Sequence, residues 1–232
     1  METEPRGDLV SHSKYLLYIA IMFVAVLMIS NTTASKLIEL GPFVISAAVI
    51  IFPVSFIFGD ILTEVYGYKT SRKVVWSGFT ALVLMSLTYW VIQVMPGAPF
   101  WQHQAAYDAI LGAVPRITFA SIVAYFCGEF VNSYVLSRMK VWTRGKKLWA
   151  RTIGSTIAGE GVDTVVFTLV AFVGVLPLSA MITIMISGYV LKVGYEILAT
   201  PVTYKIVHWL KRKEGIDVYD RGISYNPFVL AD

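Results

Sequence analysis

The stretch ITFASIVAYFCGEFVNSYVL, residues 117–136, places a carboxylate and an amide inside an otherwise largely apolar segment. It contains the phrase Gly128-Glu129-Phe130-Val131-Asn132-Ser133, and the next apolar segment repeats it as Gly159-Glu160-Gly161-Val162-Asp163-Thr164. Segments of this length and apolarity predict membrane-spanning helices. A carboxylate at bilayer depth costs on the order of 2.5 to 3.5 kcal/mol on insertion scales, so such groups face a bundle interior and mark a pathway or ligand site.

Composition extends this interpretation to the whole chain, because 56% of its 232 residues are apolar, 15% are charged, and the mean hydropathy is +0.67. We predict an all-α polytopic membrane protein with six transmembrane helices, since a barrel would show alternating strands of about ten residues. The predicted spans are 15–31, 43–62, 74–95, 117–136, 153–175 and 178–209. The predicted units are an N-terminal tail (1–14), a six-helix transmembrane domain (15–210) and a C-terminal tail (211–232).

The distribution of basic residues predicts the orientation. With a cytoplasmic N-terminus, sixteen of the nineteen lysines and arginines fall in inner segments, and the outer segments hold only Lys36 and Arg116. The remaining cation, Lys192, lies within the sixth span. By the positive-inside rule, both termini are predicted to face the cytoplasm. The same rule accounts for the net charge of +4, so we expect no nucleic-acid partner.

The two phrases predict a shared site. Glu129 with Asn132, and Glu160 with Asp163, are spaced i,i+3 and lie on one helix face. At helical rise both glutamates stand roughly 12 Å from the inner ends of their spans, so the phrases should meet in the inner half of the bundle. Small residues such as Gly128 allow a helix or a ligand to approach closely.

Two further pairs are spaced i,i+4. Asp60 with Glu64 is either a pair of solvated acids at a helix end or a buried pair, and the surrounding apolar residues favour burial. Lys192 with Glu196 is opposite in charge. A lysine at bilayer depth needs a carboxylate merely to be tolerated, so this pair has either a structural or a ligand-binding role.

Four stretches closely resemble the VUT or queuosine precursor transporter family, and the resemblance covers residues 15–213. They are FPVSFIFGDILTEVYGY from Phe52, GEFVNSYVLSRMK from Gly128, STIAGEGVDTVVF from Ser155 and LKVGYEILATPVTYKIVHWLK from Leu191. The resemblance implies a fold similar to the substrate-binding components of energy-coupling-factor vitamin transporters, and a multi-pass location in the bacterial inner membrane. It also implies import of 7-deazaguanine bases such as preQ0 and preQ1, for salvage into tRNA modification.

The buried acids suit such a purine-like base, because a carboxylate can accept both the ring N–H and the exocyclic amine of its pairing edge. Aromatic rings can stack on the flat base or cover it. The predicted substrate-binding residues are Asp60, Glu64, Glu129, Asn132, Glu160, Asp163, Lys192 and Glu196. The aromatic candidates for stacking are Phe130, Tyr134, Phe167 and Tyr195, and those for a lid are Trp101 and Tyr107.

The outer connection 96–116 predicts a short interfacial helix, since Gln104, Tyr107, Asp108 and Leu111 follow helical spacing. It acts either as a surface anchor held by Trp101 or as a gate over the outer mouth.

The sequence predicts a solitary transporter without cofactor or metal. No G-x-x-x-x-G-K-[ST] phosphate loop is present. Ala20 and Ala25 are five residues apart, which departs from the Ala-x-x-x-Ala pattern of components that dock an ATP-driven module. The alternatives are such a module-dependent component and an intramembrane enzyme using the acids for general acid and base work. Against an enzyme, the chain lacks H-E-x-x-H and G-x-S-x-G. A homo-oligomer is left open.

Overall fold

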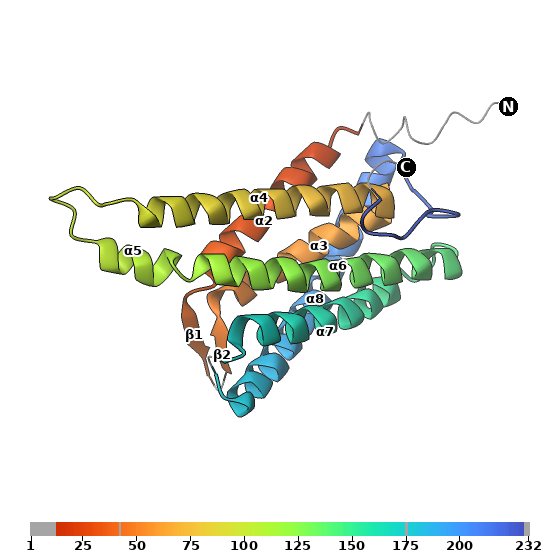
Figure 1. Ribbon diagram of the computed structural model, residues 1–232. Coiled ribbons are helices and arrows are strands. Elements are labelled where there is room, and N and C mark those ends of the chain that lie inside the picture. Colours follow the sequence, from red (N-terminus) through yellow and green to blue (C-terminus); the bar gives the residue numbers. More distant parts are fainter. Residues whose placement is uncertain (1–12, 42, 175, 230–232) are drawn as a thin grey trace.

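Six helical segments long and apolar enough to cross a membrane make up most of the computed structural model, which describes residues 13–41, 43–174 and 176–229 (Figure 1). This confirms the predicted helical membrane fold with six spans. The helices are α2 (Leu16–Thr33), α3 (Pro53–Ile61), α4 (Tyr68–Val94), α5 (Gln104–Leu111), α6 (Val114–Trp142), α7 (Leu148–Phe172) and α8 (Leu178–Glu214). The 3₁₀ helix η1 (Ala47–Ile50) and the π-helix η2 (Leu62–Tyr66) flank α3 and complete the second span.

A β-hairpin occupies the position where the second span was predicted to begin. Strands β1 (Leu37–Leu40) and β2 (Phe43–Ser46) pair antiparallel. The chain reverses at Gly41, whose φ of +57° favours glycine. The span begins only at Ala47, where the Ser46 hydroxyl caps η1 by accepting from the Ala48 N–H. The predicted start at Phe43 was therefore wrong, because the apolar residues just before Ala47 belong to a strand.

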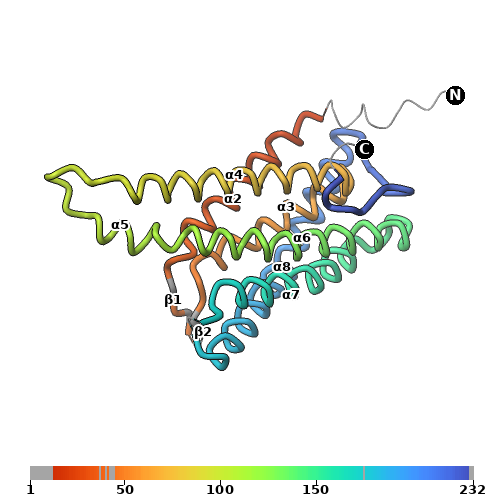
Figure 2. The backbone as a smooth tube through the Cα atoms, in the orientation of Figure 1, coloured from red at the N-terminus to blue at the C-terminus, as the bar shows by residue number. Residues whose placement is uncertain are grey.

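The bundle has two distinct ends (Figure 2). The hairpin end carries β1, β2 and the turn between α7 and α8. The termini end carries the start of α2, the end of α8, the sharp turn at Gly67 and the turn between α6 and α7. Aromatic side chains from α3, α4 and α6 fill the core between them, with ring centroids 5.3 Å apart for Phe56 and Tyr125 and 6.1 Å for Phe79 and Tyr125.

Residues 216–228 form a strap across the termini end and are not a separate tail. The Asp220 carboxylate accepts hydrogen bonds from the Tyr68 N–H (3.0 Å) and the Ser137 hydroxyl (2.7 Å). The Trp76 indole donates to the Pro227 carbonyl at 2.8 Å. The last helix, α8, continues to Glu214, beyond the predicted boundary at residue 211, and the segment after it packs on α4 and α6. The predicted N-terminal tail lies almost wholly in residues 1–12, outside the described residues.

Candidate functional site

The two repeated phrases meet where α6 and α7 cross. A Cβ built on Gly128 would lie 2.7 Å from Asp163 Cβ and 2.8 Å from the Gly159 carbonyl oxygen. One built on Gly159 would lie 2.7 Å from Asn132 Cβ and 2.8 Å from the Gly128 carbonyl oxygen. Gly128 thus packs on Gly159 and Asp163, and Gly159 packs on Gly128 and Asn132. The contact is symmetric, and the predicted meeting of the phrases is confirmed.

The face of α6 that carries Glu129 and Asn132 turns toward α3. The Glu129 carboxylate accepts from the Tyr125 hydroxyl at 3.0 Å and the Ser133 hydroxyl at 2.9 Å. The carboxylate also packs against Gly59, and a Cβ atom at residue 59 would overlap it. The Asn132 amide donates to Asp60 Oδ1 at 2.8 Å. Glycines on three helices therefore make room for buried carboxylates.

Lys192 points from α8 toward α7. Its Nζ donates to Asp163 Oδ2 at 2.7 Å and forms a 3.0 Å ion pair with Glu160 Oε2, and it lies 4.5 Å from the centre of the Phe52 ring. The expected pairing with Glu196 was wrong. The long lysine side chain reaches two carboxylates on the neighbouring helix, and that contact outweighs an i,i+4 pair worth about 0.2 to 0.5 kcal/mol.

Glu64 belongs to an ionic network at the termini end. Its Oε1 lies 2.7 Å from Arg151 Nη2, 2.6 Å from Lys211 Nζ and 3.7 Å from Lys140 Nζ. Asp217 at the edge of the strap bridges the same two lysines, at 2.7 Å from Lys140 and 2.9 Å from Lys211. Glu64 lies on the π-helix η2, a distortion often found at functional positions.

Asp60 and Glu64 are both fully buried, but Glu64 belongs to the ionic network whereas Asp60 lies at the crossing. The prediction of solvated acids at a helix end is therefore excluded for both residues.

At the edge of the network, burial raises the pKa of Asp217, but hydrogen bonds from Lys140 and Lys211 outweigh the effect of burial and hold the pKa below its ordinary value. The stabilisation from this carboxylate is therefore present at neutral pH and is lost as the pH falls through the lowered pKa.

A pocket of about 100 Å³ opens at the hairpin end and extends down to the crossing. Its charged groups are Asp163 and Lys192. Two further polar atoms in its lining, Asn31 Oδ1 and Thr164 Oγ1, are buried and have no hydrogen-bond partner among the described residues. The remaining lining is mostly small, apolar or aromatic: Ser30, Ala34, Ile45, Ser46, Ala48, Val49, Phe52, Ser121, Phe167, Thr168, Phe172, Ile184 and Gly188.

Sequence reasoning assigned no role to Asn31, Thr164 or Phe52. Asn31 is the first strongly polar residue near the end of the first span, but only the structure reveals an acceptor without a donor. Thr164 closes the second phrase, where its counterpart Ser133 bonds Glu129 instead. Of the predicted binding residues, only Asp163 and Lys192 line the pocket.

The aromatic candidates divide in the same way. Phe167 lines the pocket. Phe130 instead packs in the core against Phe126, with ring centroids 4.9 Å apart, and Tyr195 is 39% exposed on α8. Tyr134 packs edge-to-face against Tyr225 of the strap, with ring centroids 5.0 Å apart.

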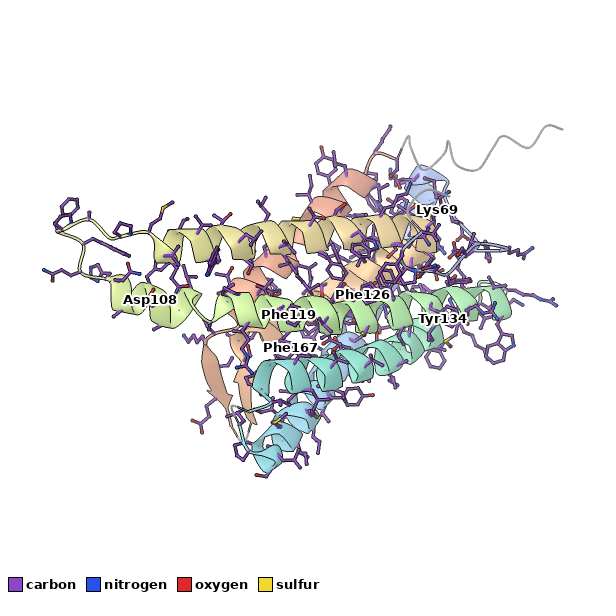
Figure 3. All side chains as sticks on the ribbon, viewed as in Figure 1. Lys69, Asp108, Phe119, Phe126, Tyr134 and Phe167 are labelled. Carbon is purple, nitrogen blue, oxygen red and sulfur yellow. The ribbon has the colours of Figure 1, made fainter. Side chains whose placement is uncertain are left out.

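The predicted lid segment contains α5, and the ring of Trp101, in the loop before α5, lies 6.0 Å from the ring of Tyr107 on it. α5 lies at the far end of the α4–α6 pair, and Figure 3 shows its Asp108 well apart from Phe167 on α7. The lining residues nearest the hairpin, here called the cover of the pocket, come instead from β2 and η1. A gating role for α5 stays a prediction.

Comparison with known proteins gives matches that cover most of the site. Residues 46–206 match the family described as "Putative vitamin uptake transporter". The chain is 29% identical over 176 residues to a Bacillus subtilis (strain 168) protein named "Probable queuosine precursor transporter", covering 75% of this chain and 77% of the relative. It is 24% identical over 159 residues to the Escherichia coli (strain K12) "Queuosine precursor transporter", covering 68% and 69%. No solved structure matches.

Proposed function

We propose that this chain, which belongs to the family described as "Putative vitamin uptake transporter", imports queuosine precursors of the 7-deazaguanine type across the bacterial inner membrane. The names of the two relatives support the substrate class. The observation that carries the proposal is the pocket, which combines aromatic walls with a charged floor and two buried polar atoms that lack partners. A concave apolar site with a few convergent polar groups is typical of small-molecule binding.

The polar groups match the edge of a deazaguanine. The Asp163 carboxylate accepts from the ring N–H and the exocyclic amine, while Lys192 balances its charge. The Thr164 hydroxyl donates to the ring carbonyl, and Asn31 Oδ1 accepts from a remaining N–H on the base. Phe52 and Phe167 stack on its faces. Glu160 and Glu129 lie next to the polar residues at the base of the pocket but do not line it.

The orientation follows from the basic residues. The termini end faces the cytoplasm, so the pocket is filled from outside. On the inner side, the Glu64 network and the strap close the path. Release of the base then requires that the network opens, which makes the described state an outward-facing one.

The transporter works without an ATP-hydrolysing partner, as the spacing of Ala20 and Ala25 suggests. The family names support transport over intramembrane catalysis.

Thr164→Val and Asn31→Leu are each expected to weaken binding of 7-cyano-7-deazaguanine about tenfold. Each leaves a polar group of the bound base without a partner, a loss of about 1 to 2 kcal/mol. Isothermal titration of the detergent-solubilised protein measures this. Thr183→Val, which removes an exposed hydroxyl on α8, serves as the matched control. Wild-type protein that binds a vitamin such as thiamine but no deazaguanine would refute the substrate class.

Labelling of single cysteines distinguishes the cover over the pocket from α5. With Cys127 replaced by alanine, a cysteine at Val49 is expected to react more slowly with an impermeant maleimide once deazaguanine saturates the site, because Val49 lines the pocket. A cysteine at Gln104 on α5 should react at an unchanged rate. Protection at Gln104 alone would return the lid role to α5.

A further inference from the structure

The carboxylate of Glu196 is the least satisfied polar group in the bundle. The residue is 1% exposed, and neither oxygen has a hydrogen-bond partner among the described residues. The nearby Thr200 hydroxyl donates to the Glu196 backbone carbonyl, and Lys192 is engaged by Asp163 and Glu160. A buried ion without partners is the costly state, so this side chain is neutral unless something else brings a charge.

The charges that face Glu196 are mostly of its own sign. Asp60 acts on it from α3 and Glu160 from α7, while Lys192 lies one turn earlier on α8. Across the crossing, five buried acids stand against the Lys192 ammonium: Asp60, Glu129, Glu160, Asp163 and Glu196. A net charge of that size cannot be held at bilayer depth. Some of these acids must carry protons or be neutralised by a bound cation.

The acids are also ordered along the bundle. Asp163 lines the pocket, and Lys192 joins it to Glu160. Glu196 lies one turn after Lys192 on α8, and Asp60 lies one turn before Glu64 of the ionic network, at the junction of α3 and η2. No group of three or more potential metal ligands among the described residues converges on one point. The arrangement is a series of carboxylates from the pocket to the termini end.

We propose that Glu196 binds and releases one proton in each transport cycle, and that import of the base is thereby coupled to the proton gradient. The proposal rests on the proposed function. The proton enters from the pocket by way of Glu160 and leaves toward the termini end by way of Asp60. Because neither Asp60 nor Glu196 lines the pocket, base and proton are bound by different groups.

Lys192 supplies the coupling. When a base donates to the Asp163 carboxylate, it shares that carboxylate with the Lys192 ammonium, which then interacts more strongly with Glu160 and keeps it ionised. An ionised Glu160 repels a second negative charge at Glu196 and so favours its protonated form. By linkage, protonation of Glu196 favours base binding to the same degree. The base and the proton are therefore transported in the same direction.

The test uses purified protein in liposomes that contain a pH-sensitive dye. The neutral 7-cyano-7-deazaguanine is the probe, so the base itself carries no proton in. In wild type, adding the base outside should acidify the lumen. A lumen one pH unit more alkaline than the outside should drive about tenfold accumulation. In Glu196→Gln, both should disappear while counterflow exchange of labelled base persists. Glu39→Gln, the same change at an exposed hairpin position, should behave as wild type.

The outcomes separate the two proposals. Wild type that exchanges the base without moving protons, or accumulates it only with a sodium gradient, overturns the inference and leaves the proposed function standing. Accumulation by Glu196→Gln equal to wild type does the same. Wild type that exchanges no deazaguanine overturns both. If Glu196→Gln does not fold, the dye measurement on wild type alone decides whether import of the base is coupled to protons.

Discussion

Lys192→Met is expected to abolish uptake and to lower the free energy of unfolding by about 3 to 5 kcal/mol. The change removes the only cation within 4 Å of Asp163 and Glu160 among the described residues. Breaking a buried pair by removing one partner leaves an uncompensated charge, which is the expensive outcome. Thermal unfolding followed by size-exclusion chromatography in detergent measures the loss. Lys36→Met, at an exposed lysine beside the hairpin, should change neither stability nor uptake.

Second-site changes identify the partners of Lys192. Adding Asp163→Asn and Glu160→Gln to Lys192→Met should restore a monodisperse protein that still fails to transport. Adding Glu196→Gln alone should restore nothing. If Glu196→Gln rescues folding instead, the lysine pairs along its own helix and the contact to α7 is refuted.

Gly128→Ala and Gly159→Ala are each expected to destabilise the protein by about 1 to 3 kcal/mol and to impair uptake. In both cases the new methyl group would meet a backbone carbonyl oxygen at 2.8 Å, so α6 and α7 must move apart. The helix propensity of alanine offsets only about 1 kcal/mol of this cost.

The neighbouring Gly161→Ala is the matched control. Its methyl group would lie 3.6 Å from the Tyr189 ring, an ordinary contact, so this variant should be as stable as wild type or slightly more stable. Thermal unfolding of the three variants in the same detergent gives the comparison. Equal stability of all three would mean that the helices do not touch at the phrases.

The crossing was predictable because both phrases carry glycine and acid at fixed helical spacing within long apolar runs. Spacing along one helix says nothing about a neighbouring helix, however. The partners of Lys192 on α7 therefore escaped prediction, as did the separation of Asp60 from Glu64.

Two further features carry no periodic signal. The residues of β2 form a short apolar run beside a span, and such a run cannot be told from the start of a helix. The strap has neither helical nor strand periodicity, so only its contacts reveal that it is ordered. The pocket was missed for a third reason, since its key atoms, Asn31 Oδ1 and Thr164 Oγ1, are recognisable only by lacking partners.

The strap also bears on how the protein folds. Residues 216–228 follow the last span and are far in sequence from the helices that they contact. Ser137 and the backbone N–H of Tyr68 receive their Asp220 partner from a segment 83 and 152 positions away along the chain. Contacts of such sequence separation form late. Until the strap docks, the six helices leave the Tyr68 N–H and the Ser137 hydroxyl without their Asp220 partner, so the termini end is the last part of the fold to be completed.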